Sequence, residues 1–261
     1  MAIFLTVVLT VYILVNLYLW FKGRRALSGT GINTALYSAV FVALASTFVI
    51  GKFLEHSYTN LFADIMNVIG GFWMGFMLYG FLAWLTADIL LLLQKPFHIV
   101  PASVIPKMRL WLFVGITSGT VLLIIIGFIN AISPVTKRYS VEIAKNLGSG
   151  TEPVKIVAVS DIHLGSIIRK RSMRHLSEMI SGEKPDLVLF MGDLLDGSIG
   201  PVLRGDLLSH LTIPAPRYGL YAITGNHEFM SDLGKSIPYI ESKGIRVLYV
   251  AKQDGSGSLT D

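Results

Sequence analysis

The chain has 261 residues, of which 52% are hydrophobic and 15% charged, and its mean hydropathy is +0.61. This composition excludes a protein that is soluble along its whole length, and the lack of cysteine excludes disulfides, thiolate metal sites and cysteine nucleophiles. The net charge of +5 is modest, and much of it lies in short clusters beside the apolar runs. Such clusters are typical of membrane topology and of anionic lipid headgroups, so we expect membrane lipids as partners and no nucleic acid.

The charged residues divide the chain into two halves. Charges are sparse before about residue 131, where long apolar runs dominate, and reach an ordinary density from Lys137 onward. Between the halves lie Pro134 and the run Gly148-Ser149-Gly150, which are typical of a linker. We therefore predict an α-helical membrane region at residues 1–132, a linker at 133–153 and a soluble domain at 154–261.

The first half contains four apolar segments that reach the roughly 20 residues needed to cross a bilayer. They run from about Ala2 to Phe21, Ala35 to Leu54, Asn67 to Leu93 and Leu110 to Ala131. The first segment lacks a basic leader and is followed at once by Lys22-Gly23-Arg24-Arg25, so we interpret it as a retained span rather than a cleaved signal peptide.

Lysine and arginine in the short loops predict the orientation of these spans. The basic residues of the first and third loops are Lys22, Arg24, Arg25, Lys95, Lys107 and Arg109. We therefore expect these two loops to face the cytoplasm, and both termini and the soluble domain to face outward from the plasma or cytoplasmic membrane. Lys137 and Arg138 after the fourth span argue for the reverse, although large domains cross membranes largely regardless of charge.

Two features inside the spans invite a functional interpretation. Asp88 interrupts the third apolar run, and a carboxylate within a membrane often marks a functional site. Asp88 also lies near the end of its span, so we favour contact with interfacial water or a neighbouring basic residue. Gly71 and Gly75 form a small-xxx-small pair, which predicts a helix-packing surface.

The second half alternates between apolar runs and helical stretches. We predict strands at Val154–Val159, Asp186–Met191, Tyr218–Ile223 and Ile245–Val250, and helices at Lys170–Ile180 and Leu233–Lys243, with a shorter one at Leu207–Leu211. Continuous apolar strands separated by helices indicate a sheet covered on both faces, with βαβ connections. In such sheets the ligand site lies beyond the carboxyl ends of the strands.

Polar clusters stand at three of these strand ends. Asp161-Ile162-His163 follows the first strand, and in an extended segment the two polar side chains would point the same way and grip one cation. Gly192-Asp193-Leu194-Leu195-Asp196-Gly197 follows the second strand, where Asp193 could bridge two metals or merely cap a turn. Gly225-Asn226-His227-Glu228 follows the third strand and offers a neutral amide oxygen and an imidazole. Each cluster alone has an ordinary structural explanation, whereas the three together indicate a metal site.

The order D-x-H, G-D-x-x-D, G-N-H-E resembles that of the calcineurin-like metallophosphoesterase superfamily, over about Val154 to Val250. The preceding spans make the chain look most like its membrane-associated branch. The resemblance implies an α/β metallophosphoesterase domain with two divalent metal ions, which are manganese, iron or zinc. It also implies that Asp161 and His163 bind the first metal and that Asp193 bridges both.

By the same resemblance, Asn226 binds the second metal, His227 serves the leaving group or the transition-state charge, and Asp196 orients His227. We assign no role to Glu228. The superfamily pattern continues with another metal-binding histidine and a Gly-His-x-His motif, whereas no histidine follows His227 here. We therefore expect the domain to be incomplete at the C-terminus, the sequence to be a fragment rather than a natural truncation, and this chain alone to be poorly active and prone to aggregate.

The leading functional hypothesis is a membrane-anchored hydrolase of phosphomonoester, phosphodiester or pyrophosphate bonds that uses a dimetal-activated water. Its location at a bilayer favours lipid-linked substrates. The alternative is a catalytically impaired sensor or scaffold that binds metal or phosphate without turnover. A transporter with an accessory domain would rest on Asp88 alone, and the sequence leaves the oligomeric state open.

Overall fold

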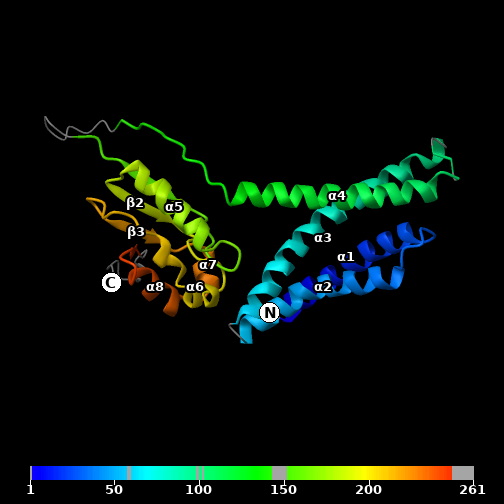
Figure 1. Ribbon diagram of the computed structural model, residues 1–261, viewed down its shortest axis with the longest axis horizontal. Coiled ribbons are helices and arrows are strands. Elements are labelled where there is room, and N and C mark those ends of the chain that lie inside the picture. Colours follow the sequence, from blue (N-terminus) through cyan, green and yellow to red (C-terminus); the bar gives the residue numbers. More distant parts are fainter. Residues whose placement is uncertain (1, 58–59, 98–99, 102, 143–151, 249–261) are drawn as a thin grey trace, which may run out of the picture. The chain divides into compact units, whose positions relative to one another are not determined.

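The computed structural model describes residues 2–57, 60–97, 100–101, 103–142 and 152–248 (Figure 1). The chain forms two compact units, Met1–Ala131 and Ile132–Asp261. The first is entirely helical, and the second is an α/β domain.

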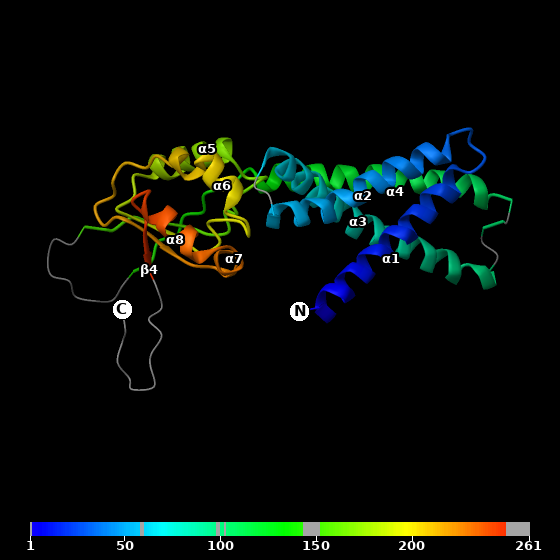
Figure 2. The same cartoon turned by 90° about the horizontal axis from the view of Figure 1, so that it is seen from below.

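The first unit consists of four long apolar helices, each long enough to cross a membrane (Figure 2). They are α1 (Ala2–Leu27), α2 (Thr34–Ser57), α3 (Leu61–Leu93) and α4 (Ile105–Ala131), and the short 3-10 helix η1 (Lys95–Phe97) follows α3. The four predicted spans are confirmed, and α1 continues through the basic run that was expected to end it. Arginine and lysine are good helix formers, and the single Gly23 costs the helix only about 1 kcal/mol.

Helices α2 and α3 approach each other closely at Gly70. A side chain there would place its Cβ 2.6 Å from the Cα of Phe48, so only glycine fits. The predicted packing pair is therefore wrong in its register: Gly71 is exposed, and a Cβ at Gly75 would only touch Ile124 at an ordinary 3.8 Å. The physical reason is that one residue on a helix is a rotation of about 100°. Gly70 and Gly71 therefore face different sides of α3.

A buried polar network also joins α1 and α3. The side chain of Asn16 donates to the Tyr12 carbonyl at 2.8 Å and accepts from the indole N–H of Trp73 at 3.0 Å. Because lipid tails are as apolar as leucine, helices in a bilayer associate through close packing and such hydrogen bonds rather than through the hydrophobic effect.

The second unit is built on a four-stranded parallel sheet with strand order β1-β2-β3-β4. Its strands are β1 (Ile156–Val159), β2 (Leu187–Met191), β3 (Leu220–Ile223) and β4 (Arg246–Leu248). Its helices are α5 (Lys170–Glu183), α6 (Gly200–Gly205), the 3-10 helix η2 (Leu207–His210), α7 (Asn226–Met230) and α8 (Leu233–Glu241). The predicted strands and helices are present, and α6 and α7 are additions that the sequence pattern did not indicate. Residues 249 and 250 of the fourth predicted strand lie outside the described residues.

The core of this domain lies on one face of the sheet. Val188, Phe190 and Ala222 point into it, where they meet apolar side chains of α5 such as Met173 and Ile180. The intervening strand residues point the other way and are half-buried or exposed. The expectation of a sheet covered on both faces is therefore wrong for the described residues, because the helices among them pack on a single face.

Candidate metal centre

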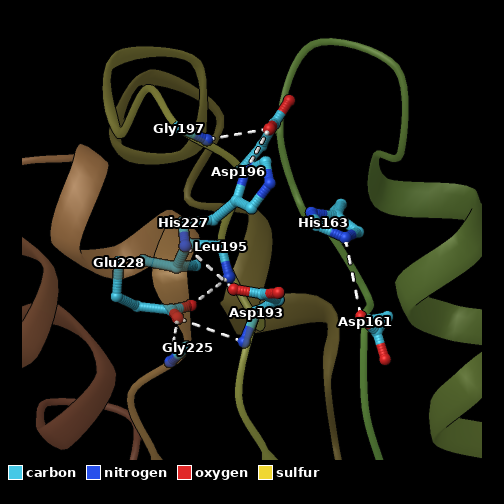
Figure 3. Close-up of polar contacts among 9 residues, drawn as sticks. All are labelled: Asp161, His163, Asp193, Leu195, Asp196, Gly197, Gly225, His227 and Glu228. Carbon is cyan, nitrogen blue, oxygen red and sulfur yellow. Dashed lines mark hydrogen bonds and ion pairs between the residues drawn. The ribbon is translucent and has the colours of Figure 1, made fainter.

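The loops after β1, β2 and β3 meet at the carboxyl edge of the parallel sheet (Figure 3). The first loop carries Asp161 and His163, and the second carries Asp193 and Asp196. The chain after β3 enters α7 directly, so His227 lies in the first turn of a helix rather than in an open turn. The strand ends thus bring together side chains that lie up to 66 positions apart in the sequence, as expected for a site at this edge.

Asp161 and His163 lie close together, but not for the reason that the spacing suggested. Both residues have left-handed backbone conformations, with φ of 55° and 50°. The segment is therefore not extended, and the argument that residues i and i+2 share one side of a strand is wrong here. Instead, backbone hydrogen bonds to the neighbouring loop hold it, from Asp161 N–H to the Gly192 carbonyl at 3.3 Å and from His163 N–H to the Asp193 carbonyl at 2.9 Å.

Asp193 is also in the left-handed region, with φ of 50°, and follows Gly192 at φ of 91°. Its Oδ1 accepts a hydrogen bond from the backbone N–H of His227 at 2.9 Å. Strain of this kind, in three non-glycine residues of one loop cluster, typically persists where the surrounding contacts over-determine the backbone and function requires it.

Gly225 allows the second and third loops to touch. A Cβ at this position would lie 2.2 Å from Oδ1 of Asp193 and 2.5 Å from its backbone nitrogen. The glycine is thus required by the close approach of the two loops, and any side chain would push Asp193 away.

Two overlapping groups of side chains in this cluster are spaced to hold a metal ion. One consists of Asp161, His163 and Asp193, and the other of His163, Asp196 and His227. Within each group one ligand atom from every residue lies within 4.8 Å of the others. The donors are carboxylate oxygens and imidazole nitrogens, which suit manganese, iron and zinc. The residues present therefore fit divalent metal ions.

Asn226 begins α7 and is exposed beside these groups. In the described chain its side chain makes no hydrogen bond, so its amide oxygen is available as a neutral ligand. The structure thus places all four predicted metal ligands at the same edge of the sheet.

Asp196 and His227 form a pair, as the resemblance implied. Nδ1 of His227 lies 3.2 Å from Oδ1 of Asp196, and the same oxygen accepts from Gly197 N–H at 2.8 Å. The ring of His227 also lies edge-on to that of His163, with centroids 4.4 Å apart. A carboxylate on one ring nitrogen orients the imidazole and leaves the other nitrogen, Nε2, for contact with a ligand.

Comparison with known proteins identifies this domain. Residues 154–259 match the family described as calcineurin-like phosphoesterase. The soluble unit carries a calcineurin-like phosphoesterase domain. This confirms the resemblance inferred from the three motifs, and the family is metal-dependent, in agreement with the ligand groups found in the structure.

Several curated proteins are similar to the chain. An uncharacterized metallophosphoesterase of Aquifex aeolicus is 34% identical over 113 residues, which are 43% of this chain and 41% of that protein. A transmembrane protein with metallophosphoesterase domain of Danio rerio is 30% identical over 132 residues, or 50% of this chain and 30% of that protein. An uncharacterized metallophosphoesterase of Campylobacter jejuni is 26% identical over 238 residues, or 87% of this chain and 59% of that protein.

The chain thus spans less than two thirds of the length of these relatives. No solved structure matches it significantly. The apolar helices and the transmembrane relative together indicate a membrane protein.

Glu228 is the residue of the phosphoesterase domain whose importance the sequence analysis missed. It is 1% exposed, and its carboxylate accepts three backbone hydrogen bonds, from Asp193 at 3.1 Å, Leu195 at 2.8 Å and Gly225 at 2.7 Å (Figure 3). Its position could have been a clue, because an acidic residue three places after a helix N-cap commonly bonds back to the N-cap N–H. The bonds to the second loop could not be foreseen, since they depend on the approach of two separate strands.

Asp88 in the membrane unit belongs to none of the possible metal-binding groups among the described residues. Its carboxylate forms an ion pair with Lys22 at 2.5 Å and accepts from the Tyr18 hydroxyl at 2.7 Å. The interpretation that it reaches a neighbouring basic residue near the helix end is therefore confirmed.

Proposed function

We propose that this protein is a membrane-anchored, metal-dependent phosphoric ester hydrolase that acts on phosphomonoester, phosphodiester or pyrophosphate bonds. The observation that carries the proposal is the convergence of oxygen and imidazole donors from three strand ends at one edge of the sheet, where Asp161, His163 and Asp193 are spaced to hold a metal ion. A set of hard ligands at the carboxyl edge of a parallel sheet suits a phosphate ester bound through divalent cations.

The described residues divide naturally into ligands and proton-handling groups. Asp161, His163 and Asp193 would hold one ion, and Asp193 together with Asn226 would hold a second. Two divalent ions in such a site supply Lewis acidity, which lowers the pKa of a water molecule and stabilises charge on the attacking and leaving oxygens. Asp193 would suit the bridging position because its carboxylate accepts from α7 and also lies within 4.8 Å of the ligand atoms of Asp161 and His163.

His227 is placed to serve the leaving group. Asp196 lies against Nδ1, so the imidazolium form of His227 could donate a hydrogen bond from Nε2 to a phosphate oxygen or give that proton to the departing oxygen. A positioned acid of this kind typically contributes about 10²- to 10⁴-fold to a rate. Asp196 acts through His227 and is thus a positioning residue.

A lipid-linked phosphate ester is the substrate class that we favour. The four spans keep the domain near a bilayer, where such esters are concentrated. In addition, Phe229 and Met230 follow the site residues on α7 and are 67% and 71% exposed. Apolar side chains so close to a polar site are suited to contact the hydrocarbon part of an amphipathic substrate.

The direct test is hydrolysis by the full-length gene product in detergent micelles, measured on p-nitrophenyl phosphate, bis-p-nitrophenyl phosphate and a lipid pyrophosphate. We expect turnover with Mn²⁺, none with EDTA, and a loss of at least about 100-fold in Asp193→Asn. Asp232→Asn, which changes an exposed aspartate on the same domain, should remain active. Metal binding without turnover on any ester would contradict the proposal and identify a sensor or scaffold instead.

The same experiment tests the lipid-linked class. The double variant Phe229→Ser/Met230→Ser should raise KM for the lipid pyrophosphate and leave KM for p-nitrophenyl phosphate unchanged. An equal effect on both substrates would contradict a role in binding hydrocarbon.

We also propose that the soluble domain faces outward and that the loops after α1 and α3 face the cytoplasm. The absence of cysteine makes this easy to test, since one introduced thiol is then the only thiol in the chain. In intact cells an impermeant maleimide should label Glu178→Cys and spare Thr30→Cys. The reverse pattern would overturn the orientation.

A further inference from the structure

A basic cavity lies at the end of the membrane bundle where α1 and α3 end and α4 begins. Its volume is about 840 Å³. The charged side chains that line it are Lys22, Arg24, Arg25, Lys95, Arg109 and Asp88. The basic ones come from the end of α1, from η1 and from the start of α4, and the fold gathers them around one hollow.

The cavity holds more positive charge than the protein neutralises. Asp88 pairs with Lys22 at 2.5 Å, and the Lys22 ammonium also lies 5.3 Å from the ring of Trp84. Among the described residues, none of the other four basic side chains forms an ion pair. Like charges around a hollow of low dielectric repel one another, so an anion bound there would be stabilised by all of them.

Most of the remaining wall of the cavity is apolar, with Ser28 and Gln94 as polar exceptions. Phe21, Trp84 and Leu112 line it, and Trp84 also lines a second cavity of about 590 Å³ between α2, α3 and α4. That second cavity is walled almost wholly by aliphatic and aromatic side chains, among them Phe72 and Phe113. A charged hollow that adjoins an apolar one suits an amphipathic molecule better than a small soluble anion.

We infer that the basic cavity binds the phosphate headgroup of an anionic membrane phospholipid, whose acyl chain extends past Trp84. The depth of the site favours this occupant: the basic residues stand at the ends of membrane-spanning helices, where headgroups lie. Helix α4 runs from this cavity to Ala131 at the opposite end of the bundle, and none of the proposed metal ligands lines it. Lipid binding in this cavity is therefore independent of the proposed hydrolysis.

Native mass spectrometry of the full chain, delipidated in detergent and titrated with dioleoylphosphatidylglycerol or dioleoylphosphatidylcholine, tests the inference. We expect the wild type to retain one phosphatidylglycerol at a concentration at least about tenfold below that needed for phosphatidylcholine, since each basic group near a headgroup contributes roughly fivefold. The double variant Arg25→Gln/Arg109→Gln should lose this preference. Arg25→Lys/Arg109→Lys should keep most of the preference for phosphatidylglycerol. This result would show that the double glutamine variant loses the preference through its lost charge and not through misfolding.

Lys107→Gln is the matched control for Arg109→Gln, because Lys107 lies on the same helix two residues away and does not line the cavity. It should bind phosphatidylglycerol as the wild type does. An equal loss of phosphatidylglycerol binding in Lys107→Gln would show that the preference depends on general surface charge and would overturn the site. Displacement of the lipid by millimolar inorganic phosphate, with retention of phosphate alone, would overturn the lipid as occupant.

Discussion

The carboxylate of Glu228 in α7 accepts a hydrogen bond at 3.1 Å from the backbone N–H of Asp193, which lies in the loop after β2. It also accepts from Leu195 and Gly225, so one buried acid sets the spacing between the loop after β2 and the start of α7. The predicted metal ligands Asp193 and Asn226 project from these same two segments. Glu228 thus determines the geometry of the metal centre without being one of its ligands.

Glu228→Gln should reduce stability by about 1–3 kcal/mol, because an amide NH₂ would replace an acceptor oxygen and leave a buried backbone N–H without a partner. It should also weaken Mn²⁺ binding through displacement of Asp193. Thermal unfolding and a Mn²⁺ titration measure the two effects. Glu178→Gln, which makes the same change on the exposed side of α5, should alter neither. Unchanged Mn²⁺ affinity in Glu228→Gln would show that the buried carboxylate does not position the ligands.

Gly225→Ala should abolish metal binding even though the substitution adds only one methyl group. The new Cβ would meet Asp193 Oδ1 at 2.2 Å, so the carboxylate and its loop must shift. Gly182→Ala in α5 is the control, since a Cβ there meets nothing within 4 Å. That variant should be neutral or stabilised by up to about 1 kcal/mol, because alanine favours helix more than glycine does. Wild-type metal affinity in Gly225→Ala would refute the close approach of the two loops.

Asp196→Asn should lower kcat while changing metal affinity little, because Asp196 acts by orienting His227. We expect a loss of about 10- to 100-fold, smaller than that of His227→Gln, which removes the proton donor itself. Steady-state kinetics with saturating Mn²⁺ and a parallel metal titration separate the two effects. If Asp196→Asn instead loses metal, Asp196 is a ligand in the group with His163 and His227.

The fold was largely predictable from the sequence because its signals are local. Continuous apolar runs predicted the four spans and the parallel strands, and the helical pattern from Lys170 predicted α5. The exposed second face of the sheet was not predictable. Apolar alternation within β2 is too weak to distinguish a strand covered on both faces from one covered on a single face.

The candidate site was predictable as a set of residues but not as a geometry. The strand-end rule correctly placed Asp161, His163 and Asp193 together, although it assumed an extended segment where the backbone is left-handed. That conformation is held by backbone hydrogen bonds to the neighbouring loop after β2. Glu228 likewise acts through hydrogen bonds to that loop. Such contacts join residues 30 or more positions apart, and no local pattern in one sequence encodes them.

Asp206 should contribute a small pH dependence to the stability of the phosphoesterase domain. The ammonium of Lys243 at 2.7 Å, aided by the Tyr239 hydroxyl at 3.0 Å, holds the pKa of this carboxyl below its ordinary value of 3.8. Because the pKa is lower in the folded state, the stabilisation is fully present above pH 3.8 and is lost as the pH falls through the folded-state value. The carboxylate is about half exposed, so solvent screening keeps the effect to a fraction of a kcal/mol.

Asp206→Asn should therefore be less stable than the wild type at pH 7, and the difference should shrink below pH 3.8 and vanish once the pH is below the lowered folded-state pKa. Asparagine tolerates the left-handed backbone at this position, so the substitution tests charge rather than conformation. Denaturant unfolding at several pH values provides the measurement. Lys243→Gln should reproduce the loss at pH 7, and a difference that persists undiminished in acid would exclude the ion pair as its cause.

The most direct test of the metal centre is a Mn²⁺ titration of the protein in detergent, followed by electron paramagnetic resonance, for the wild type, Asp193→Asn and Asp232→Asn. Asp193 links the three strand-end loops, so its carboxylate is the ligand whose loss should matter most. We predict that the wild type and Asp232→Asn bind Mn²⁺ alike and that Asp193→Asn binds it at least about tenfold more weakly. Equal Mn²⁺ binding by all three proteins would contradict a metal centre at the edge of this sheet.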